Sequence, residues 1–218
     1  MDRPMRLMGL LLGASLLGFV ASPTSAEMKG GSLELGPAMP SGDGVTDNYG
    51  PVWLNLQAGY RLAGSESTEH VLTLGISGMG KSRTFEVARP SGAPMPKADY
   101  FARLFSFGYT FKYRPFRPLY LGGGGGYYLV GTEAKYDAGE GYQWTATGER
   151  EIKLTTSKGV FAPHVVAGVQ LSERFGIEAR YTFIKTILAG NTSQYYYLTA
   201  VPDSELTGLA SLSGSFRF

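Results

Sequence analysis

One stretch of the chain matches a phosphate-binding motif. Gly75–Ser82 reads GISGMGKS, which fits the nucleotide-binding pattern G-x-x-x-x-G-K-S and follows a strand-like segment. A working loop of this kind opens a helix whose N-terminus receives the phosphates. The residues that follow include Pro90, Pro94 and Pro96, which are incompatible with such a helix. We therefore expect a strand that runs into a loop, without nucleotide binding.

Five consecutive glycines, Gly122–Gly126, form a second conspicuous stretch. A dinucleotide-binding motif would continue into a helix with an acidic residue further on, and neither pattern follows here. Glycine inside a strand more often marks strong curvature or close packing. We expect the run to leave room for large neighbours such as Tyr120 and Tyr128.

Metal and thiol chemistry have few candidate ligands. The chain contains no cysteine and only two histidines, His70 and His164, which lie far apart in the sequence. Zinc sites are built from Cys and His at short spacings. We predict no metal site and no cofactor, and we expect His164, which lies in the polar register of a strand, to be an interior hydrogen-bonding residue.

These residues lie on segments in which apolar side chains alternate with polar or small ones. A period of two is typical of strands with two different faces. Eight segments are strand-like, the fifth by its aromatic and aliphatic content, and the last ends at the final residue. They are Gly31–Pro40, Val52–Leu62, His70–Met79, Tyr100–Arg114, Leu119–Val130, Val160–Leu171, Phe175–Lys185 and Leu206–Phe218.

The connections between these segments alternate strictly between long and short, beginning with a long one. Outer-membrane barrels have short periplasmic turns and long external loops, which lie at opposite ends of the barrel. The sequence therefore predicts an all-β fold, an eight-stranded antiparallel up-and-down transmembrane β-barrel with both termini in the periplasm. A soluble barrel would show the same alternation with its apolar face inside, but the alternating loops and the aromatic C-terminus favour the membrane.

The first residues have the features of an export signal. Arg3 and Arg6 precede a continuous apolar run, Leu7–Ala21, which small residues follow. This order is that of a secretory signal peptide, and the run is shorter than the ~20 residues that a spanning helix needs. We predict a signal peptide at 1–26 and one barrel domain at 27–218. The net charge of +2 gives no indication of nucleic-acid binding.

Several motifs carry a resemblance to a known family. They are the N-terminal signal, the strand endings GYRL (Gly59–Leu62) and ARYTF (Ala179–Phe183), the stretch LYLGGGGGYY (Leu119–Tyr128) and the terminal Phe-Arg-Phe. On these residues the chain resembles the small outer-membrane β-barrel proteins of Gram-negative bacteria, such as the OmpA transmembrane domain, OmpX and OmpW. The resemblance spans essentially the whole mature chain and indicates an architecture rather than an activity. It implies that Phe216 and Phe218 are part of the signal read by the barrel-assembly machinery.

Charged residues occupy the register of these strands that would face inward. Unpaired charges in a barrel interior are costly, so we predict a paired network in the periplasmic half, with Glu34 and Glu178 flanking Arg217. Eight strands enclose a space that side chains about fill, so such a network would first be a plug and only second a pore lining. The predicted interior polar network consists of Glu34, Glu178, Arg180, Arg217 and His164, with Lys112 and Arg61 as further candidates.

Three functions remain open for such a barrel. The first, which the resemblance implies, is a non-enzymatic surface protein that serves envelope integrity, adhesion or another surface interaction. Its contact surfaces would be the loops Gly131–Gly159 and Thr186–Glu205, the second with Tyr195–Tyr197. The second is a narrow channel for small or hydrophobic solutes. The third, a lipid A-modifying enzyme, is disfavoured because neither histidine has the His-x-Ser spacing of the deacylases; we expect no catalytic residues.

The same interpretation gives the expected surroundings of the protein. We expect it in the bacterial outer membrane, in contact with lipid and lipopolysaccharide. The expected partners are the barrel-assembly machinery and a surface ligand of the outer loops. We expect a monomer that binds no nucleic acid.

Overall fold

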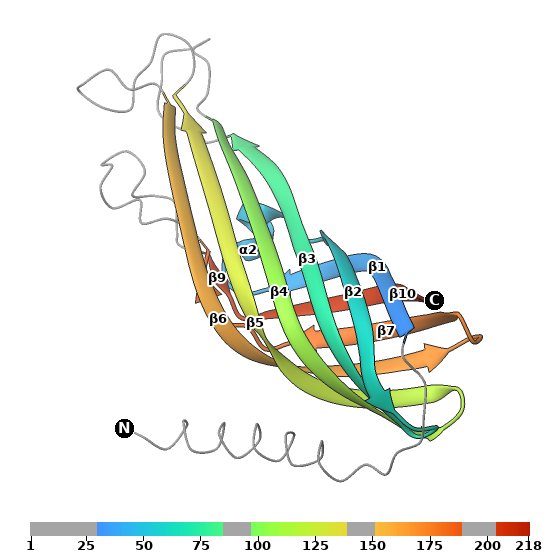
Figure 1. Cartoon of the computed structure of the whole chain (residues 1–218). Helices are drawn as coiled ribbons and strands as arrows, with labels where there is room; N and C mark the ends of the chain where they lie inside the picture. Colours follow the sequence, from blue (N-terminus) through green and yellow to red (C-terminus); the bar gives the residue numbers. More distant parts are fainter. Residues whose placement is uncertain (1–29, 85–96, 139–150, 189–203) are drawn as a thin grey trace, which may run out of the picture.

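The computed structural model describes residues 30–84, 97–138, 151–188 and 204–218. Its long strands close into a barrel in which every strand is antiparallel to both neighbours (Figure 1). The barrel strands are β1 (Gly30–Ser41), β2 (Trp53–Gly64), β3 (Thr68–Thr84), β4 (Lys97–Phe116), β5 (Leu119–Asp137), β6 (Glu151–Gln170), β7 (Phe175–Thr182) and β10 (Gly208–Arg217). The other described elements are α2 (Val45–Tyr49), β8 (Thr186–Ile187) and β9 (Glu205–Leu206).

The barrel strands follow one another around the ring in chain order, and β10 pairs with β1 to close it. Closure reaches the last residue, because Gly31 and Phe218 each donate a backbone hydrogen bond of 3.0 Å to the other. The three short turns lie at one end of the barrel together with Gly30 and Phe218, and we call this the turn end. The longer connections lie at the opposite end, the loop end. The predicted eight-stranded up-and-down barrel is confirmed.

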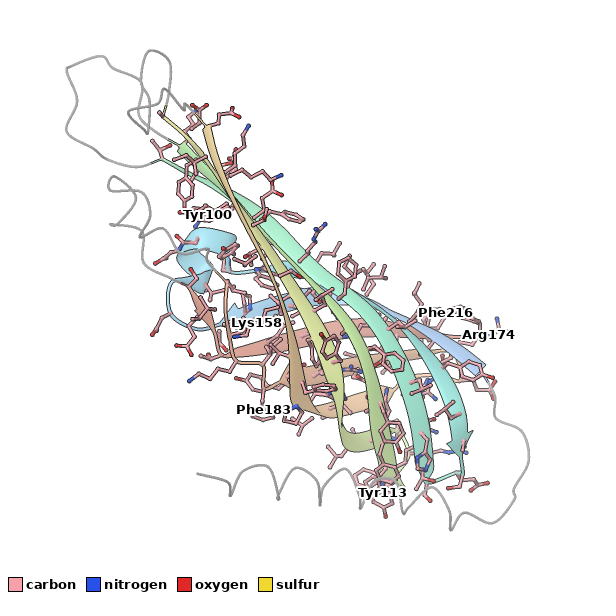
Figure 2. All side chains as sticks on the ribbon, turned by 60° about the vertical axis from the view of Figure 1, so that its left-hand side comes forward. Tyr100, Tyr113, Lys158, Arg174, Phe183 and Phe216 are labelled. Carbon is pink, nitrogen blue, oxygen red and sulfur yellow. The ribbon has the colours of Figure 1, made fainter. Side chains whose placement is uncertain are left out.

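Within the barrel the outward face of the strands is apolar. Leu54, Leu74 and Phe107 are more than half exposed, whereas inward neighbours such as Asn55 and Thr73 are buried. Aromatic side chains gather at the turn end of this band, where Figure 2 labels Tyr113 and Phe216. A soluble barrel would have its apolar face inside, so this arrangement is that of a barrel in lipid.

Strands β3 to β6 are longer than the rest. They have 17, 20, 19 and 20 residues, against 8 to 12 in the other barrel strands. Figure 1 shows them continuing past the barrel at its loop end. We call this extension the wall. It comprises Gly78–Thr84, Lys97–Arg103, Gly131–Asp137 and Glu151–Ser157, aligned row by row, and at about 3.4 Å per residue it is roughly 20 Å tall.

The wall corrects the predicted strand bounds, which ended β3 at Met79 and β5 at Val130 and assigned most of the wall to loops. In β4, β5 and β6 the alternation continues into the wall with its polarity reversed, so that mostly polar residues face outward and apolar or small ones face inward. Above Leu104, the outward positions of β4 include Lys97 and Asp99, and the inward positions are small or aromatic. An apolar outward register therefore identifies only the part of each strand that belongs to the apolar band of the barrel.

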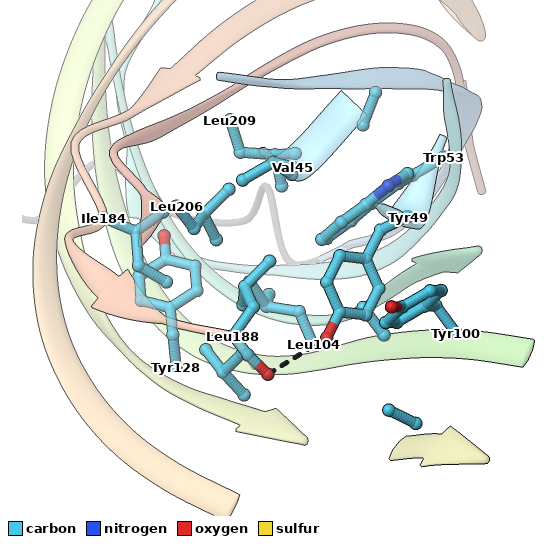
Figure 3. Packing of buried hydrophobic residues seen from close by; sticks show 14 of the residues in the cluster. Val45, Tyr49, Trp53, Tyr100, Leu104, Tyr128, Ile184, Leu188, Leu206 and Leu209 are labelled. Atoms are coloured by element: carbon cyan, nitrogen blue, oxygen red, sulfur yellow. Dashed lines mark hydrogen bonds between the residues drawn. The ribbon is translucent and has the colours of Figure 1, made fainter. Parts of the chain in front are cut away.

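The loop end is filled by two segments that fold into the barrel. These are α2, between β1 and β2, and the hairpin β8–β9, between β7 and β10. The segment after β7 was predicted to extend that strand to Lys185, but the strand ends at Thr182 and Ile184 is fully buried. We call the resulting cluster the apolar plug, and Figure 3 shows its members. They include Val45, Tyr49, Trp53, Tyr100, Leu104, Tyr128, Ile184, Leu188, Leu206 and Leu209.

The glycine run lies where β5 passes close to the backbone of β4. A Cβ atom on Gly124 would lie 1.9 Å from the carbonyl oxygen of Tyr109 and 3.0 Å from the imidazole of His164. A Cβ atom on Gly125, which faces outward, would meet its nearest neighbour at 3.5 Å. The inward glycines therefore permit close approach of strand to strand, rather than only making room for large side chains.

We predict that Gly124→Ala lowers the free energy of unfolding by about 3 kcal/mol, because the added methyl group must displace the β4 backbone. Gly125→Ala is the matched control, with ordinary van der Waals contacts and an effect of about 0.5 kcal/mol or less. Urea unfolding in detergent micelles measures both. Equal midpoints for the two variants would contradict this account of the run.

Candidate functional site

The interior of the barrel divides into two chemically different halves. The half toward the turn end carries buried or partly buried charged side chains from six strands. The half toward the loop end holds the apolar plug. Because inward residues alternate with outward ones along each strand, every inward charge is held away from lipid and must find its partners inside the barrel.

The first group of charges, the central network, joins β1, β4 and β7. Glu178 accepts hydrogen bonds from Lys112 and, at 2.9 Å, from Arg180, and the hydroxyl of Tyr120 donates to it at 3.0 Å. Glu34 lies 3.8 Å from Lys112 and 3.9 Å from Arg180. All four charged residues are at most 7% exposed. Two cations thus balance two carboxylates, as the low polarity of a buried site requires.

The second group, the basic cluster, lies nearer the turn end around Glu69 of β3, which is 2% exposed. Arg61 of β2 and Arg114 of β4 each donate to its Oε1. Arg217 of β10 donates to both carboxylate oxygens, at 3.1 and 3.3 Å. Three guanidinium groups therefore share one carboxylate.

These groups correct the predicted pairing. The structure brings Glu34, Glu178 and Arg180 together, but Arg217 contacts Glu69 and is not flanked by the two expected carboxylates. The predicted arrangement is wrong because Arg217 pairs with Ser32, one inward row nearer the turn end than Glu34. Glu69 was missed because it had been assigned to the turn before His70. Its place one residue before an alternating strand was the available signal.

The two histidines lie in opposite registers of the barrel strands, one facing inward and one facing outward. His164 is 2% exposed and lies inside, with Nε2 at 2.8 Å from the hydroxyl of Thr110 and Nδ1 at 3.3 Å from that of Tyr128. His70 lies in the outward register, 2.5 Å from the hydroxyl of Tyr109. Within the described ranges, no group of three His, Cys, Asp or Glu side chains could hold a metal ion.

The apolar plug is held by specific contacts as well as by burial. The hydroxyl of Tyr49 donates to the carbonyl of Leu188 at 3.1 Å, the bond drawn in Figure 3. The ring of Tyr49 meets that of Tyr100 edge to face, with centroids 5.5 Å apart. Asn48 donates to Ser204 at 2.9 Å. These bonds tie α2 to the β8–β9 hairpin and to β4, and so keep both segments inside the barrel.

The remaining features singled out in the sequence lie outside the central network, the basic cluster and the apolar plug. The stretch Gly75–Ser82 lies within β3 as extended strand. Phe216 and Phe218 lie at the turn end, 37% and 76% exposed, with ring centroids 6.3 Å apart, and their role in assembly stays a prediction. The expected contact residues Tyr195–Tyr197 lie outside the described residues. Among the residues that the structure describes, no helix has the length and apolar character needed to cross a membrane.

Comparison with known proteins gives a likeness in structure alone. No protein-family model matches the chain, and no curated protein is similar enough in sequence to match it. The chain is similar to Ail, the attachment invasion locus protein of Yersinia pestis, solved in complex with the heparin analogue sucrose octasulfate. The identity is 16%, with 88% of this chain and 100% of Ail covered and a TM-score of 0.51. It is also similar to Neisserial surface protein A, at 13% identity, with 89% and 98% covered and a TM-score of 0.43. The chain has the fold of the small outer-membrane β-barrel proteins.

The central network gives a test that separates its two carboxylates. We predict that Glu178→Gln lowers the free energy of unfolding by about 3 kcal/mol, because it leaves Lys112 and Arg180 without their closest buried anion. Glu34→Gln should cost less than half as much, since Glu34 is 3.8 Å or more from both cations. Urea unfolding in micelles provides the measurement.

Glu133→Gln serves as the control for this pair of variants. Glu133 forms an exposed ion pair with Lys153 at 2.9 Å, and exposed pairs contribute about 0.5 kcal/mol or less. If Glu34→Gln proved as costly as Glu178→Gln, the two carboxylates would be equivalent and the geometry given above would be wrong.

Proposed function

We propose that this protein is an integral outer-membrane barrel that presents the wall at the cell surface and binds a partner there, without catalysing a reaction. In this orientation the turn end and both ends of the described barrel, Gly30 and Phe218, face the periplasm. The wall is the observation that carries the proposal. The apolar plug and the charge pattern of the outer surface support it.

The outer surface indicates where the lipid ends. The outward residues of β4 are aromatic from Phe111 to Phe105, and charged residues begin at Arg103. Beside Arg103 in the sheet, the outward residues are Gly131 of β5 and Ser157 of β6. The outward residues of these two strands beyond this level are polar. A hydrocarbon layer favours the apolar band, and a charged face beyond it belongs in water.

The wall is built to stand in water. Lys135 and Glu151 pair at 3.1 Å across its outward face, as do Glu133 and Lys153 at 2.9 Å. Because the Glu151 carboxylate accepts its hydrogen bond, the pKa of the Lys135 ammonium group is raised, and the Lys135 side chain stays charged at physiological pH. A rigid sheet standing above the membrane is a suitable platform for binding.

The charge of the wall favours a particular kind of partner. Four basic and four acidic side chains on its outward face cancel, which favours a protein surface over a polyanion. An exposed aromatic among such residues is a typical anchor of a protein interface, and Phe101 is 47% exposed on this face. The eight charged residues are Lys97, Arg103, Lys135, Lys153, Asp99, Glu133, Asp137 and Glu151.

The name of Ail, attachment invasion locus protein, also refers to attachment, but the similarity between this chain and Ail is one of fold. A channel function is disfavoured by the apolar plug, which fills the loop-end half of the lumen with side chains such as Tyr49 and Leu188. Catalysis is disfavoured because His164, the interior histidine, contacts Thr110 and Tyr128 rather than a carboxylate.

An adhesion assay tests the proposed function. Cells that produce the protein should adhere to a film of mixed extracellular-matrix proteins, and Phe101→Ala should reduce adhesion about tenfold, the effect of losing one interface anchor. The matched control is Phe107→Ala, which removes an outward phenylalanine of the same strand inside the apolar band. Equal adhesion by the two variants would contradict binding through the wall.

Surface display is verified in the same cells with an epitope inserted in the connection 139–150. An antibody that cannot cross the membrane should label it on intact cells. The same epitope in the turn Ser65–Ser67 should be labelled only after the outer membrane is broken. Labelling of that turn on intact cells would show that the proposed orientation is wrong.

Conductance separates the proposed function from the channel alternative. In a planar bilayer we predict no discrete openings, because the apolar plug and the central network occupy successive levels of the lumen. Reproducible unitary currents would overturn this prediction and make the inward charges determinants of selectivity.

A further inference from the structure

The turn end of the barrel contains a cavity of about 910 Å³. It is lined by residues of β1, β2, β3, β4, β6 and β10 and by the two turns that follow β4 and β6. No member of the apolar plug lines it. The cavity is therefore separate from the wall, at the opposite end of the barrel.

The lining of this cavity is strongly basic. Among the described lining residues, six carry a positive charge and three carry a negative charge. They are Arg61, Lys112, Arg114, Arg117, Arg174 and Arg217, against Glu34, Glu69 and Glu173. Lys112 and Glu34 belong to the central network, which is balanced by Arg180 and Glu178. The excess therefore lies in the basic cluster and on the two turns.

The basic cluster also has more hydrogen-bond donors than acceptors. A guanidinium group has five N–H donors, whereas a carboxylate offers about four lone-pair sites. Arg114 and Arg217 both donate to Glu69, which cannot satisfy ten N–H groups. The Nε of Arg114 is buried without a hydrogen-bond partner in the part of the chain that the structure describes. The basic cluster therefore has more N–H donors than Glu69 can accept, and these donors lie beside an open cavity.

We propose that this cavity binds a soluble phosphate-type dianion, such as inorganic phosphate or a phosphate monoester, through Arg114 and Arg217. Arg114, Arg117, Arg174 and Arg217 line the cavity against Glu69 and Glu173, an excess of two positive charges that a dianion balances. Arginine recognises phosphate through paired N–H donors, which suits this ligand better than a single-point anion. Because both side chains lie inside the barrel, a lipid headgroup outside it does not reach them.

Calorimetric titration of inorganic phosphate into the barrel, folded in maltoside micelles that contain no phosphate, tests the proposal. At pH 8, where phosphate is mainly the dianion, we expect saturable binding that sodium chloride of equal ionic strength does not reproduce. Arg114→Gln and Arg217→Gln should each weaken it about tenfold or more, the effect of losing one charge-assisted hydrogen bond. Arg103→Gln, which removes an outward arginine from the wall, should leave the affinity unchanged.

Glu69→Gln keeps the test decisive if the arginine variants fold poorly. This substitution removes the anion that competes for the same donors, so it should tighten phosphate binding while lowering stability in phosphate-free buffer. A purely structural cluster would show only the loss of stability. No saturable binding to the wild type, binding matched by chloride, or unchanged affinity in Glu69→Gln and both arginine variants would each overturn the proposal. None of these outcomes depends on partner binding by the wall.

Discussion

The pairing of β10 with β1 is the constraint on which the rest of the structure depends. It runs from Ser32 opposite Arg217 to Ser41 opposite Gly208, and it leaves the barrel without an open edge. In hydrocarbon an unpaired backbone amide costs several kcal/mol, so a sheet in lipid must close. Closure also fixes which side chains face inward. Glu34, Lys112 and Glu178 are then enclosed together, and their mutual pairing is a consequence of the ring.

The interior follows a gradient of access to water. At mid-barrel, cations and carboxylates are equal in number and are nearly fully buried. One step nearer the turn end, where the cavity opens, three arginines share Glu69. An excess of charge is costly in a dry interior and much less so beside water, because solvent screens it. Toward the loop end the lumen turns apolar, and segments such as α2 fill it with buried side chains such as Val45 and Tyr49. The three levels of the interior thus differ in how each avoids an isolated charge.

How much could be predicted depends on which physical signal each residue carries. The barrel and its strand order follow from the alternation of outward apolar residues such as Leu72, Leu74 and Ile76, and from the lengths of the connections. The wall was not predicted because strands were identified only by an apolar register that faces outward. From Arg103 toward the loop end, the outward positions of β4 include charged residues, and the apolar or small residues face inward. The five residues of α2 are too few to show a helical period. The partner of Arg217 depends on the stagger between strands, which closure of the ring determines and no local pattern reveals.

The two ends of the barrel are chemically independent. The wall and the cavity share β3 and β4, but the apolar plug and the central network lie between them inside the barrel. A backbone ladder closed by hydrogen bonds on both sides is also stiff, and a shift of one strand would require its neighbours to shift as well. Such a scaffold favours two fixed binding surfaces over a transmitted conformational change. A closed barrel of this size is therefore suited to hold the proposed partner surface of the wall and the proposed anion cavity in fixed positions at its two ends.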